Sequence, residues 1–281
     1  MEQKKEVYSY SKLCCFESCQ YDYYLTYILG KRGGETVYTF LGTACHEILE
    51  SLQKNEIDND EAIERFLTQV EEADFLGLQW YSDKSRNDYV TSIIHFFSNY
   101  KRYDNDVLME QKFEMEIEGI LMKGFIDLVV FDKDNEHVDV YDYKTSTKFA
   151  TKDLPHYGRQ LVLYAYAIKK LYPQLEIKNI GWNMLKYALI QGKRKIKPEL
   201  RCNIDESEWN VPYILEWKYD EDTINDLLKF ITDTVNEIET KKNEDDYQPC
   251  DLTKNSYNCH MNCDHSKYCK HYQNYIKTIK K

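Results

Sequence analysis

The segment from residue 112 to residue 144 constrains the fold more than any other part of the chain. From Lys112 to Glu118 apolar and charged residues alternate, which predicts a strand with one buried face. Leu121–Phe131 is a mostly apolar run interrupted by Asp127, and it predicts a second strand. After a polar turn, His137–Lys144 has the pattern of a third strand. Three strands so close in sequence predict a β-sheet.

Segments with helical periodicity surround this sheet. We expect helices in five segments: residues 8–29, 42–54, 60–102, 159–171 and 220–241. Thr43 is the expected N-cap of the second helix. Residues 179–189 are expected to add a further strand. A small mixed sheet flanked by helices predicts an α/β core.

The composition is that of a globular protein. Of the 281 residues, 42% are hydrophobic and 30% are charged, so the chain can bury a full core. The longest apolar run, Leu161–Ile168, is too short to span a bilayer, and the first ten residues lack the apolar stretch of a signal peptide. We therefore expect an intracellular, cytoplasmic protein with no membrane partner.

The charge of the chain is negative and unevenly distributed. A net charge of −11 argues against a general polyanion binder, so any contact with nucleic acid must rest on a local basic surface. A candidate basic stretch consists of Lys193, Arg194, Lys195, Lys197 and Arg201. This stretch either faces phosphates or is a solvated surface. Residues 55–76 are acidic and form either a solvated surface or a surface for a partner protein.

A pair of carboxylates with a nearby lysine is the pattern that suggests chemistry. Asp127 stands among apolar neighbours, where a charge is costly unless it is paired or bound to a cation. Asp142 and Lys144 share one face of their strand because residues two apart point the same way. If the two strands form a hairpin, a divalent cation between Asp127 and Asp142 would relieve their repulsion. This arrangement suits phosphodiester hydrolysis, with an ordinary salt bridge as the alternative.

Five motifs around these residues follow one another along the chain. They are Leu41-Gly42-Thr43-x-x-His46-x-x-Leu49-Glu50, Glu110-x-x-Phe113, Gly124-x-Ile126-Asp127, Asp142-Tyr143-Lys144-Thr145 and Gln160-x-x-x-Tyr164 followed by Tyr172. Together they resemble the active-site region of the PD-(D/E)XK nuclease superfamily. The resemblance is to the branch that contains RecB- and AddB-type nuclease domains, exonuclease V and CRISPR-adaptation nucleases. It implies a restriction-endonuclease-like core with a helical insertion.

The resemblance also implies a metal site and a catalytic lysine. His46, Asp127, Asp142 and the backbone carbonyl of Tyr143 would hold Mg²⁺ or Mn²⁺, as one ion or two. Lys144 would orient the attacking water and help to deprotonate it. Taken alone, a histidine such as His46 is more often a helix residue with ordinary hydrogen-bond partners than a metal ligand.

Three more residues receive auxiliary roles from the resemblance. Gln160 and Tyr164 would face DNA and the metal-bound water, and Glu110 would be an acidic residue before the core hairpin. The alternatives are polar helix surface for Gln160 and core packing for Tyr164 and Tyr172.

The cysteines indicate a second metal centre. The chain has nine cysteines and no export signal, which argues against a disulfide framework. Cys259, Cys263 and Cys269 are spaced C-x3-C-x5-C, which favours thiolate ligation of zinc or an iron–sulfur cluster. Spacing alone leaves the fourth ligand open, and the candidates are Cys14, Cys15, Cys19, Cys250, His260 and His265.

The resemblance selects Cys19, because the segment from Ser9 to Leu25 is similar to the opening motif of the iron–sulfur members. It implies one [4Fe–4S] cluster on Cys19, Cys259, Cys263 and Cys269, which would staple the N- and C-terminal regions together. The sequence departs from the family pattern at Gln20, where proline is usual, and in the three residues between Cys259 and Cys263, where two are usual. Zinc therefore stays an alternative. Cys45 and Cys202 are expected to be core thiols, and Cys14 and Cys15 receive no role.

The expected organisation is a single nuclease domain over residues 1–281. Its parts are the N-terminal cysteine and helical motif (8–54), a helical insertion (55–105), the catalytic core (106–190), a basic segment with a long helix (191–245) and the cysteine cluster (246–281).

The expected function is exonucleolytic cleavage of single-stranded DNA or DNA ends. The sequence contains no G-x-x-x-x-G-K-[ST] motor motif, so helicase, recombination or CRISPR-adaptation proteins are expected partners. Two other classes of function stay open. One is a non-catalytic DNA-binding or assembly module of the same fold, and the other is a zinc-stapled interaction protein.

Overall fold

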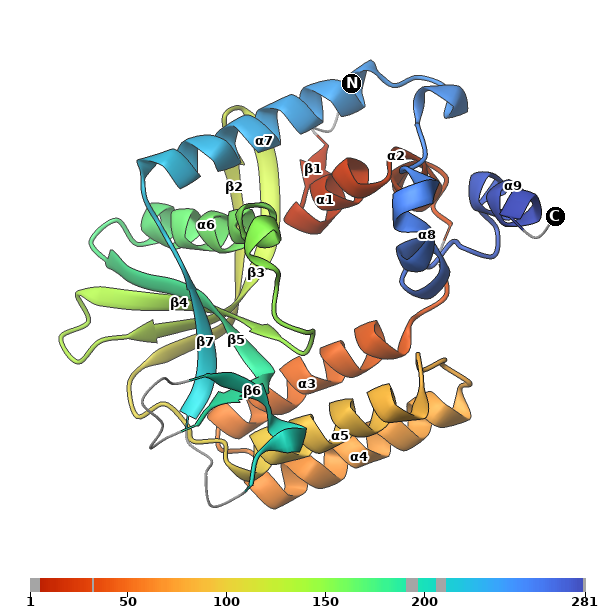
Figure 1. Ribbon diagram of the computed structural model, residues 1–281. Coiled ribbons are helices and arrows are strands. Elements are labelled where there is room, and N and C mark those ends of the chain that lie inside the picture. The colour runs from red at the N-terminus through yellow and green to blue at the C-terminus, as the bar shows by residue number, and fades with distance from the viewer. Residues whose placement is uncertain (1–5, 32, 191–196, 206–210, 280–281) are drawn as a thin grey trace. The chain divides into compact units, whose positions relative to one another are not determined.

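The computed structural model describes residues 6–31, 33–190, 197–205 and 211–279 (Figure 1). The chain divides into two compact units. The larger unit comprises residues 37–113 and 125–224, and the smaller unit comprises residues 1–36, 114–124 and 225–281.

A mixed sheet forms the centre of the larger unit. Its strands are β2 (Val107–Ile117), β3 (Ile120–Phe131), β4 (His137–Lys144), β5 (Glu176–Leu189), β6 (Pro198–Leu200) and β7 (Val211–Trp217). Strand β3 is antiparallel to β4, β4 is parallel to β5, and both β6 and β7 are antiparallel to β5. Residues 114–124, the far ends of β2 and β3 with their turn, are counted with the smaller unit.

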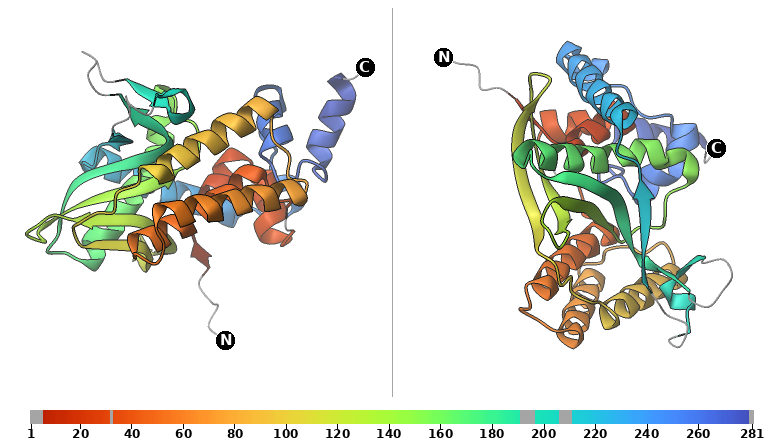
Figure 2. Two further views of the ribbon diagram at one scale, coloured as in Figure 1. Left: turned by 90° about the horizontal axis from the view of Figure 1, so that it is seen from below. Right: turned by 90° about the vertical axis from the view of Figure 1, so that its left-hand side faces the viewer.

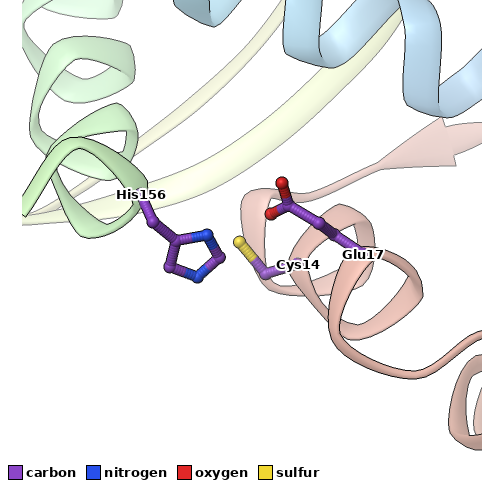
Figure 3. Close-up of side chains that lie close together, drawn as sticks. All are labelled: Cys14, Glu17 and His156. Atoms are coloured by element: carbon purple, nitrogen blue, oxygen red, sulfur yellow. The ribbon is translucent and has the colours of Figure 1, made fainter. Parts of the chain in front are cut away.

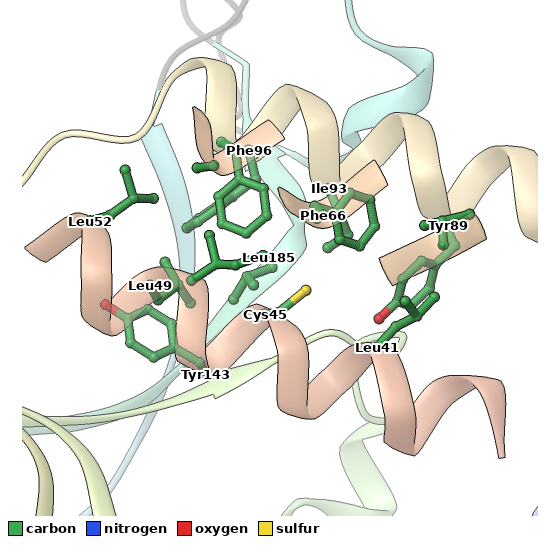
Figure 4. Packing of buried hydrophobic residues seen from close by; sticks show 14 of the residues in the cluster. Leu41, Cys45, Leu49, Leu52, Phe66, Tyr89, Ile93, Phe96, Tyr143 and Leu185 are labelled. Carbon is green, nitrogen blue, oxygen red and sulfur yellow. The ribbon is translucent and has the colours of Figure 1, made fainter. Parts of the chain in front are cut away.

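Three helices cover one face of this sheet. They are α3 (Val37–Gln53), α4 (Asn59–Phe75) and α5 (Asp83–Ser98). Leu49 of α3, Phe66 of α4 and Phe96 of α5 pack with Tyr143 of β4 and Leu185 of β5 in one buried apolar cluster (Figure 4). This cluster is called the helical core below.

Helix α6 (Leu154–Leu171) covers the opposite face of the sheet. Figure 2 shows α3, α4 and α5 in orange to yellow on one side of the strands and α6 in green on the other. Tyr141 and Tyr143 of β4 face the helical core, so Asp142 and Lys144 point to the α6 face because side chains alternate along a strand. The sheet flanked by helices confirms the predicted α/β architecture.

The predicted start of the second helix is wrong. Helix α3 begins at Val37 rather than Gly42, and Thr43 lies inside it, where its hydroxyl donates a hydrogen bond to the Thr39 carbonyl. Val37, Leu41 and Ala44 are all buried on one side of α3. Burial of this stripe stabilises the extra turn despite the low helix propensity of the β-branched and aromatic residues there.

Two further features differ from the prediction: the helical segment 60–102 and an additional strand of the sheet. Residues 60–102 do not form one continuous helical stretch, because α4 and α5 are separated by residues 76–82 and the helix ends at Ser98. Strand β7 was not expected. It carries Pro212 and, among the described strands, pairs only with β5, a position that tolerates the missing proline N–H.

The smaller unit is built from helices around aromatic packing. Its elements are β1 (Val7–Tyr8), α1 (Tyr10–Ser18), α2 (Gln20–Tyr23), the π-helical turn η1 (Tyr24–Ile28), α7 (Glu221–Thr240), α8 (Leu252–Met261) and α9 (Lys270–Ile279). The rings of Phe16, Tyr23 and Tyr247 contact one another in its interior. Among the helices of the described residues, none is both long and apolar enough to cross a bilayer.

Candidate active site

Asp127 of β3 and Asp142 of β4 face each other across neighbouring strands. The antiparallel register pairs Leu128 with Tyr141, and one step further along it places Asp127 opposite Asp142. The exposed fractions of these two residues are 7% and 1%. Two acidic side chains therefore share a site that water hardly reaches, which is costly without positive charge nearby.

Asp127 is held in place by the backbone of the neighbouring strand. Its Oδ2 accepts a hydrogen bond of 2.9 Å from the backbone N–H of Tyr143. Burial, and then the charge of Asp142, raise the pKa of Asp127 to about 7. A buried carboxylate whose ionised form is this disfavoured suits a site where a bound cation supplies the missing positive charge.

Lys144 pairs with the second carboxylate. Its Nζ lies 2.7 Å from Oδ2 of Asp142 and donates hydrogen bonds to Oδ1 of Asp142 at 2.9 Å and to Oε1 of Gln160 at 3.3 Å. Burial lowers the pKa of Lys144, but the carboxylates of Asp142 and Asp127 outweigh it, so the pKa lies above its ordinary value. Gln160 in turn donates a 2.7 Å hydrogen bond to the hydroxyl of Tyr164 on the next turn of α6.

His46 reaches the same place from helix α3. Its Nδ1 lies 3.5 Å from Oε1 of Glu110 and 3.6 Å from Oδ2 of Asp127, and its Nε2 lies 3.2 Å from the carbonyl oxygen of Tyr143. Burial lowers the pKa of His46, whereas the hydrogen bond to Glu110 and the charge of Asp127 raise it, and the net pKa is raised. The imidazole thus stands between two carboxylates and the carbonyl predicted to bind metal.

Glu110 joins this group through an unusual backbone conformation. Its φ is +48°, in the left-handed region that non-glycine residues rarely adopt, although it lies within strand β2. The ligand atoms of His46, Glu110 and Asp127 all lie within 4.8 Å of one another. Sequence reasoning gave Glu110 only an auxiliary role, because the turn of backbone that directs it toward His46 leaves no mark in the residue pattern.

The donor atoms at this site suit a hard divalent cation. They comprise the carboxylates of Glu110 and Asp127, one imidazole nitrogen of His46 and, next to His46, the carbonyl oxygen of Tyr143. The carboxylate of Asp142 is paired with Lys144 beside this group. Mg²⁺ and Mn²⁺ prefer oxygen donors of this kind, and Mn²⁺ also accepts imidazole. The residues present therefore fit the cation that the resemblance implies.

A comparison with protein families identifies the family of this chain. The family model described as "PD-(D/E)XK nuclease superfamily" matches residues 7–270. The chain belongs to the PD-(D/E)XK nuclease superfamily. The acidic pair and the lysine of this nuclease-superfamily chain lie on adjacent strands, with the histidine and the glutamine supplied by helices on opposite faces of the sheet.

Two solved structures that are similar to this chain share little sequence identity with it. One is named as a "putative exonuclease" from Eubacterium rectale, with 11% sequence identity, a TM-score of 0.46, and coverage of 87% of this chain and 84% of the other. Another, named SSO0001, has 15% identity, a TM-score of 0.29, and coverage of 89% and 94%. No curated protein matches this nuclease-superfamily sequence significantly.

The structure does not bring every predicted residue to the site. Lys193, Arg194 and Lys195 lie outside the described residues. Tyr172 is the C-cap of α6, two turns beyond Tyr164. Arg201, counted in the basic stretch, is only 1% exposed, and its guanidinium lies 3.2 Å from Nδ1 of His95, so it belongs to the interior rather than to a phosphate-facing surface.

The predicted cluster cysteines come together in the smaller unit. Cys19, Cys259, Cys263 and Cys269 line one small pocket, and Cys250 lines it with them. Sγ of Cys250 lies 3.5 Å from Sγ of Cys259, and the backbone N–H of Cys250 faces Sγ of Cys19 at 3.4 Å. Five thiols therefore surround the position where the resemblance requires four. The fifth one, Cys250, is among the candidates that spacing alone left open for the fourth ligand.

His265 also lines this pocket, but both of its ring nitrogens have other partners. Nδ1 lies 2.8 Å from Oδ1 of Asp22, and Nε2 lies 3.1 Å from the carbonyl oxygen of Lys31. This argues against His265 as a zinc ligand. Asp22 also accepts hydrogen bonds from the thiols of Cys15 and Cys263.

The other cysteines lie elsewhere. Cys14 is on α1, one turn before Glu17, with both side chains on the same side of the helix (Figure 3). Cys45 is fully buried within the helical core, and Cys202 is half-buried.

Proposed function

We propose that this chain is a Mg²⁺- or Mn²⁺-dependent deoxyribonuclease that acts on single-stranded DNA or DNA ends. The observation that carries the proposal is the convergence of His46, Glu110 and Asp127 beside the Asp142–Lys144 pair. An ordinary salt bridge would use one carboxylate, whereas this site gathers three around a single histidine and lysine. The membership of the nuclease superfamily supports the same reaction class.

In the proposed reaction, the residues that would hold the cation are His46, Glu110, Asp127, Asp142 and the Tyr143 carbonyl. A divalent cation bound there would polarise the scissile phosphate and lower the pKa of water. Lys144, which is positioned by Asp142 and Gln160, presents its ammonium group to the attacking water, orients it and, through its positive charge, helps the water to lose its proton to solvent. The ammonium of Lys144 also stabilises negative charge that develops on the phosphate. The resemblance implies a product with a 5′-phosphate.

We also propose that the smaller unit carries a [4Fe–4S] cluster on Cys19, Cys259, Cys263 and Cys269. The grouping of these thiols around one pocket supports it, and thiolates are the usual ligands of such clusters. Zinc is the alternative metal. Proteins that unwind or deliver DNA, such as a helicase or a recombination or CRISPR-adaptation complex, are the proposed partners.

The decisive experiment is digestion of end-labelled single- and double-stranded DNA with Mg²⁺, Mn²⁺ or EDTA. We expect the wild-type protein to degrade DNA with either cation and to be inactive in EDTA. Lys144→Ala should reduce the rate at least a hundredfold. Equal degradation by wild type and Lys144→Ala would reveal a contaminating nuclease or a wrong site. A wild type that binds DNA without cleaving it would instead favour the non-catalytic module.

A further inference from the structure

We propose that residues 145–160 form a platform for single-stranded DNA, in which Tyr157 stacks on a base and Lys148 and Lys152 contact phosphates. The inference rests on the proposed nuclease function, because it names the part of the substrate that this segment holds. The segment follows directly after Lys144 and runs through the short η2 turn (Thr151–Asp153) into α6.

The first observation is the place of Tyr157 on helix α6. Tyr157, Gln160 and Tyr164 are three and four residues apart, so they lie along one face of the helix. Gln160 contacts Nζ of Lys144 at 3.3 Å and Tyr164 at 2.7 Å. Tyr157 therefore stands one turn, about 5 Å along the axis, from a residue that touches the catalytic lysine.

The second observation is a set of stacked aromatic rings that holds Tyr157. The ring of Phe149 lies against the ring of Tyr157 with centroids 4.1 Å apart and an interplanar angle of 22°. Phe149 also meets the fully buried ring of Trp182 edge-on at 5.1 Å. Trp182 is itself 6.3 Å from the ring of Trp217. A rigid support of this kind lowers the entropic cost of binding a base.

Gly158 allows this packing. A Cβ at this position would meet Nε1 of Trp217 at 2.2 Å, so only glycine lets α6 approach the tryptophan so closely. On the same turn of α6, the ring of His156 (Figure 3) meets the ring of Tyr157 edge-on, with centroids 5.0 Å apart. The close approach of Gly158 to Trp217 thus holds the turn that carries Tyr157.

Tyr157 nevertheless keeps 40% of its surface exposed. An exposed aromatic ring beside a nuclease site is a sequence-independent binding surface, because every base has a face that can stack on it.

The third observation is local charge. From residue 145 to residue 160 the chain has Lys148, Lys152 and Arg159 against one acid, Asp153, while its net charge is −11. Lys148 and Lys152 are both exposed. Positive charge interleaved with aromatic rings is the combination that single-stranded nucleic acid requires, and charge complementarity favours it over a protein partner.

Binding is tested on the full-length protein in EDTA, where cleavage is excluded. The probe is a short labelled oligothymidylate measured by fluorescence anisotropy, with a blunt duplex for comparison. We expect Tyr157→Ala to weaken single-strand binding roughly tenfold, and Tyr157→Phe to keep it, because the ring alone stacks. Tyr81→Ala removes another exposed tyrosine of the larger unit and is the matched control. Thermal melting shows whether each variant is folded.

A second measurement, the fluorescence of a base analogue, detects base stacking separately from binding affinity. A single 2-aminopurine in the oligonucleotide should be quenched on binding to wild type and to Tyr157→Phe, and this quenching should disappear with Tyr157→Ala. The double variant Lys148→Gln/Lys152→Gln should lower the slope of log K against log salt by about 1.4, or about 0.7 for each phosphate that a lysine no longer neutralises.

Two outcomes of the DNA-binding assay overturn the platform. One is single-strand binding by folded Tyr157→Ala that equals the wild type, and the other is an equal loss of single-strand and duplex binding. Binding of a protein ligand that depends on Tyr157, without an effect on DNA, would assign the surface to a protein partner instead. If the wild type binds in a Tyr157-dependent manner but never cleaves, the nuclease proposal fails and the platform stands. If it cleaves with no dependence of KM on Tyr157, the platform fails and the nuclease proposal stands.

Discussion

The backbone N–H of Tyr143 donates a hydrogen bond of 2.9 Å to the carboxylate of Asp127. A strand residue that would ordinarily extend the β-ladder is thus bound by an acidic side chain from the neighbouring strand. This contact fixes the orientation of Asp127 and leaves the Tyr143 carbonyl facing His46, at 3.2 Å from its Nε2. The two groups proposed to hold a cation are therefore positioned by one strand pair.

Neutralising Asp127 should abolish cleavage while preserving the fold. Asp127→Asn keeps the shape and the hydrogen bond from Tyr143, but it removes the charge that a cation needs. We expect the rate of DNA degradation to fall at least a hundredfold, with little change in melting temperature. Asp134→Asn, in the exposed turn between β3 and β4, is the control and should match the wild type. Activity retained by Asp127→Asn would remove this residue from the site.

Glu110 should contribute to metal affinity rather than to folding. We expect Glu110→Gln to raise the Mn²⁺ or Mg²⁺ concentration that gives half-maximal activity by roughly 10- to 100-fold, because it removes one anionic donor beside His46. Titration calorimetry with Mn²⁺ measures the same loss without catalysis. Glu114→Gln changes an exposed carboxylate on the same strand and should leave the metal requirement unaltered. An unchanged Mn²⁺ affinity in Glu110→Gln would restrict Glu110 to an auxiliary role.

Lys144 should matter for stability as well as for rate. Lys144→Ala leaves Asp142, which is 1% exposed, without its ion-pair partner at 2.7 Å. We expect the free energy of unfolding in EDTA to fall by about 3 kcal/mol, as for other broken buried pairs. Denaturant unfolding measures this loss. The double variant Asp142→Asn/Lys144→Ala should regain most of the stability but none of the activity. If the single variant is as stable as the wild type, the pair is not a buried ion pair in solution.

The proposed iron–sulfur cluster predicts the metal content of the purified protein. Protein purified without oxygen should be brown and contain about four iron and four sulfide per chain, following the proposed [4Fe–4S] stoichiometry. Cys259→Ser should lose most of the iron. Cys250→Ser should retain the iron, because Cys250 lines the pocket but is not one of the four proposed ligands. Cys202→Ser is the control outside the pocket. Iron lost from Cys250→Ser would place Cys250 in the ligand set, and zinc without iron would reject the cluster.

Local pattern predicted the parts of the site that lie within single elements. The alternation along residues 137–144 places Asp142 and Lys144 on one face of β4, and the structure has them there. The boundaries of that strand also agree with the prediction. Local pattern failed where packing overrides propensity, as at the start of α3, where burial of Val37 and Leu41 extends the helix.

The sequence by itself determined the α/β architecture, the acidic pair with its lysine, and the short spacing of the last three cysteines. These follow from periodicity and from covalent distance, which act over a few residues. Tertiary structure alone decided that His46 meets Tyr143 across 97 positions of sequence, that a backbone with φ of +48° directs Glu110 toward them, and that Arg201 is interior. These contacts and this burial depend on how elements distant in sequence pack together and on where packing excludes water. The residue pattern along one segment contains no information on either.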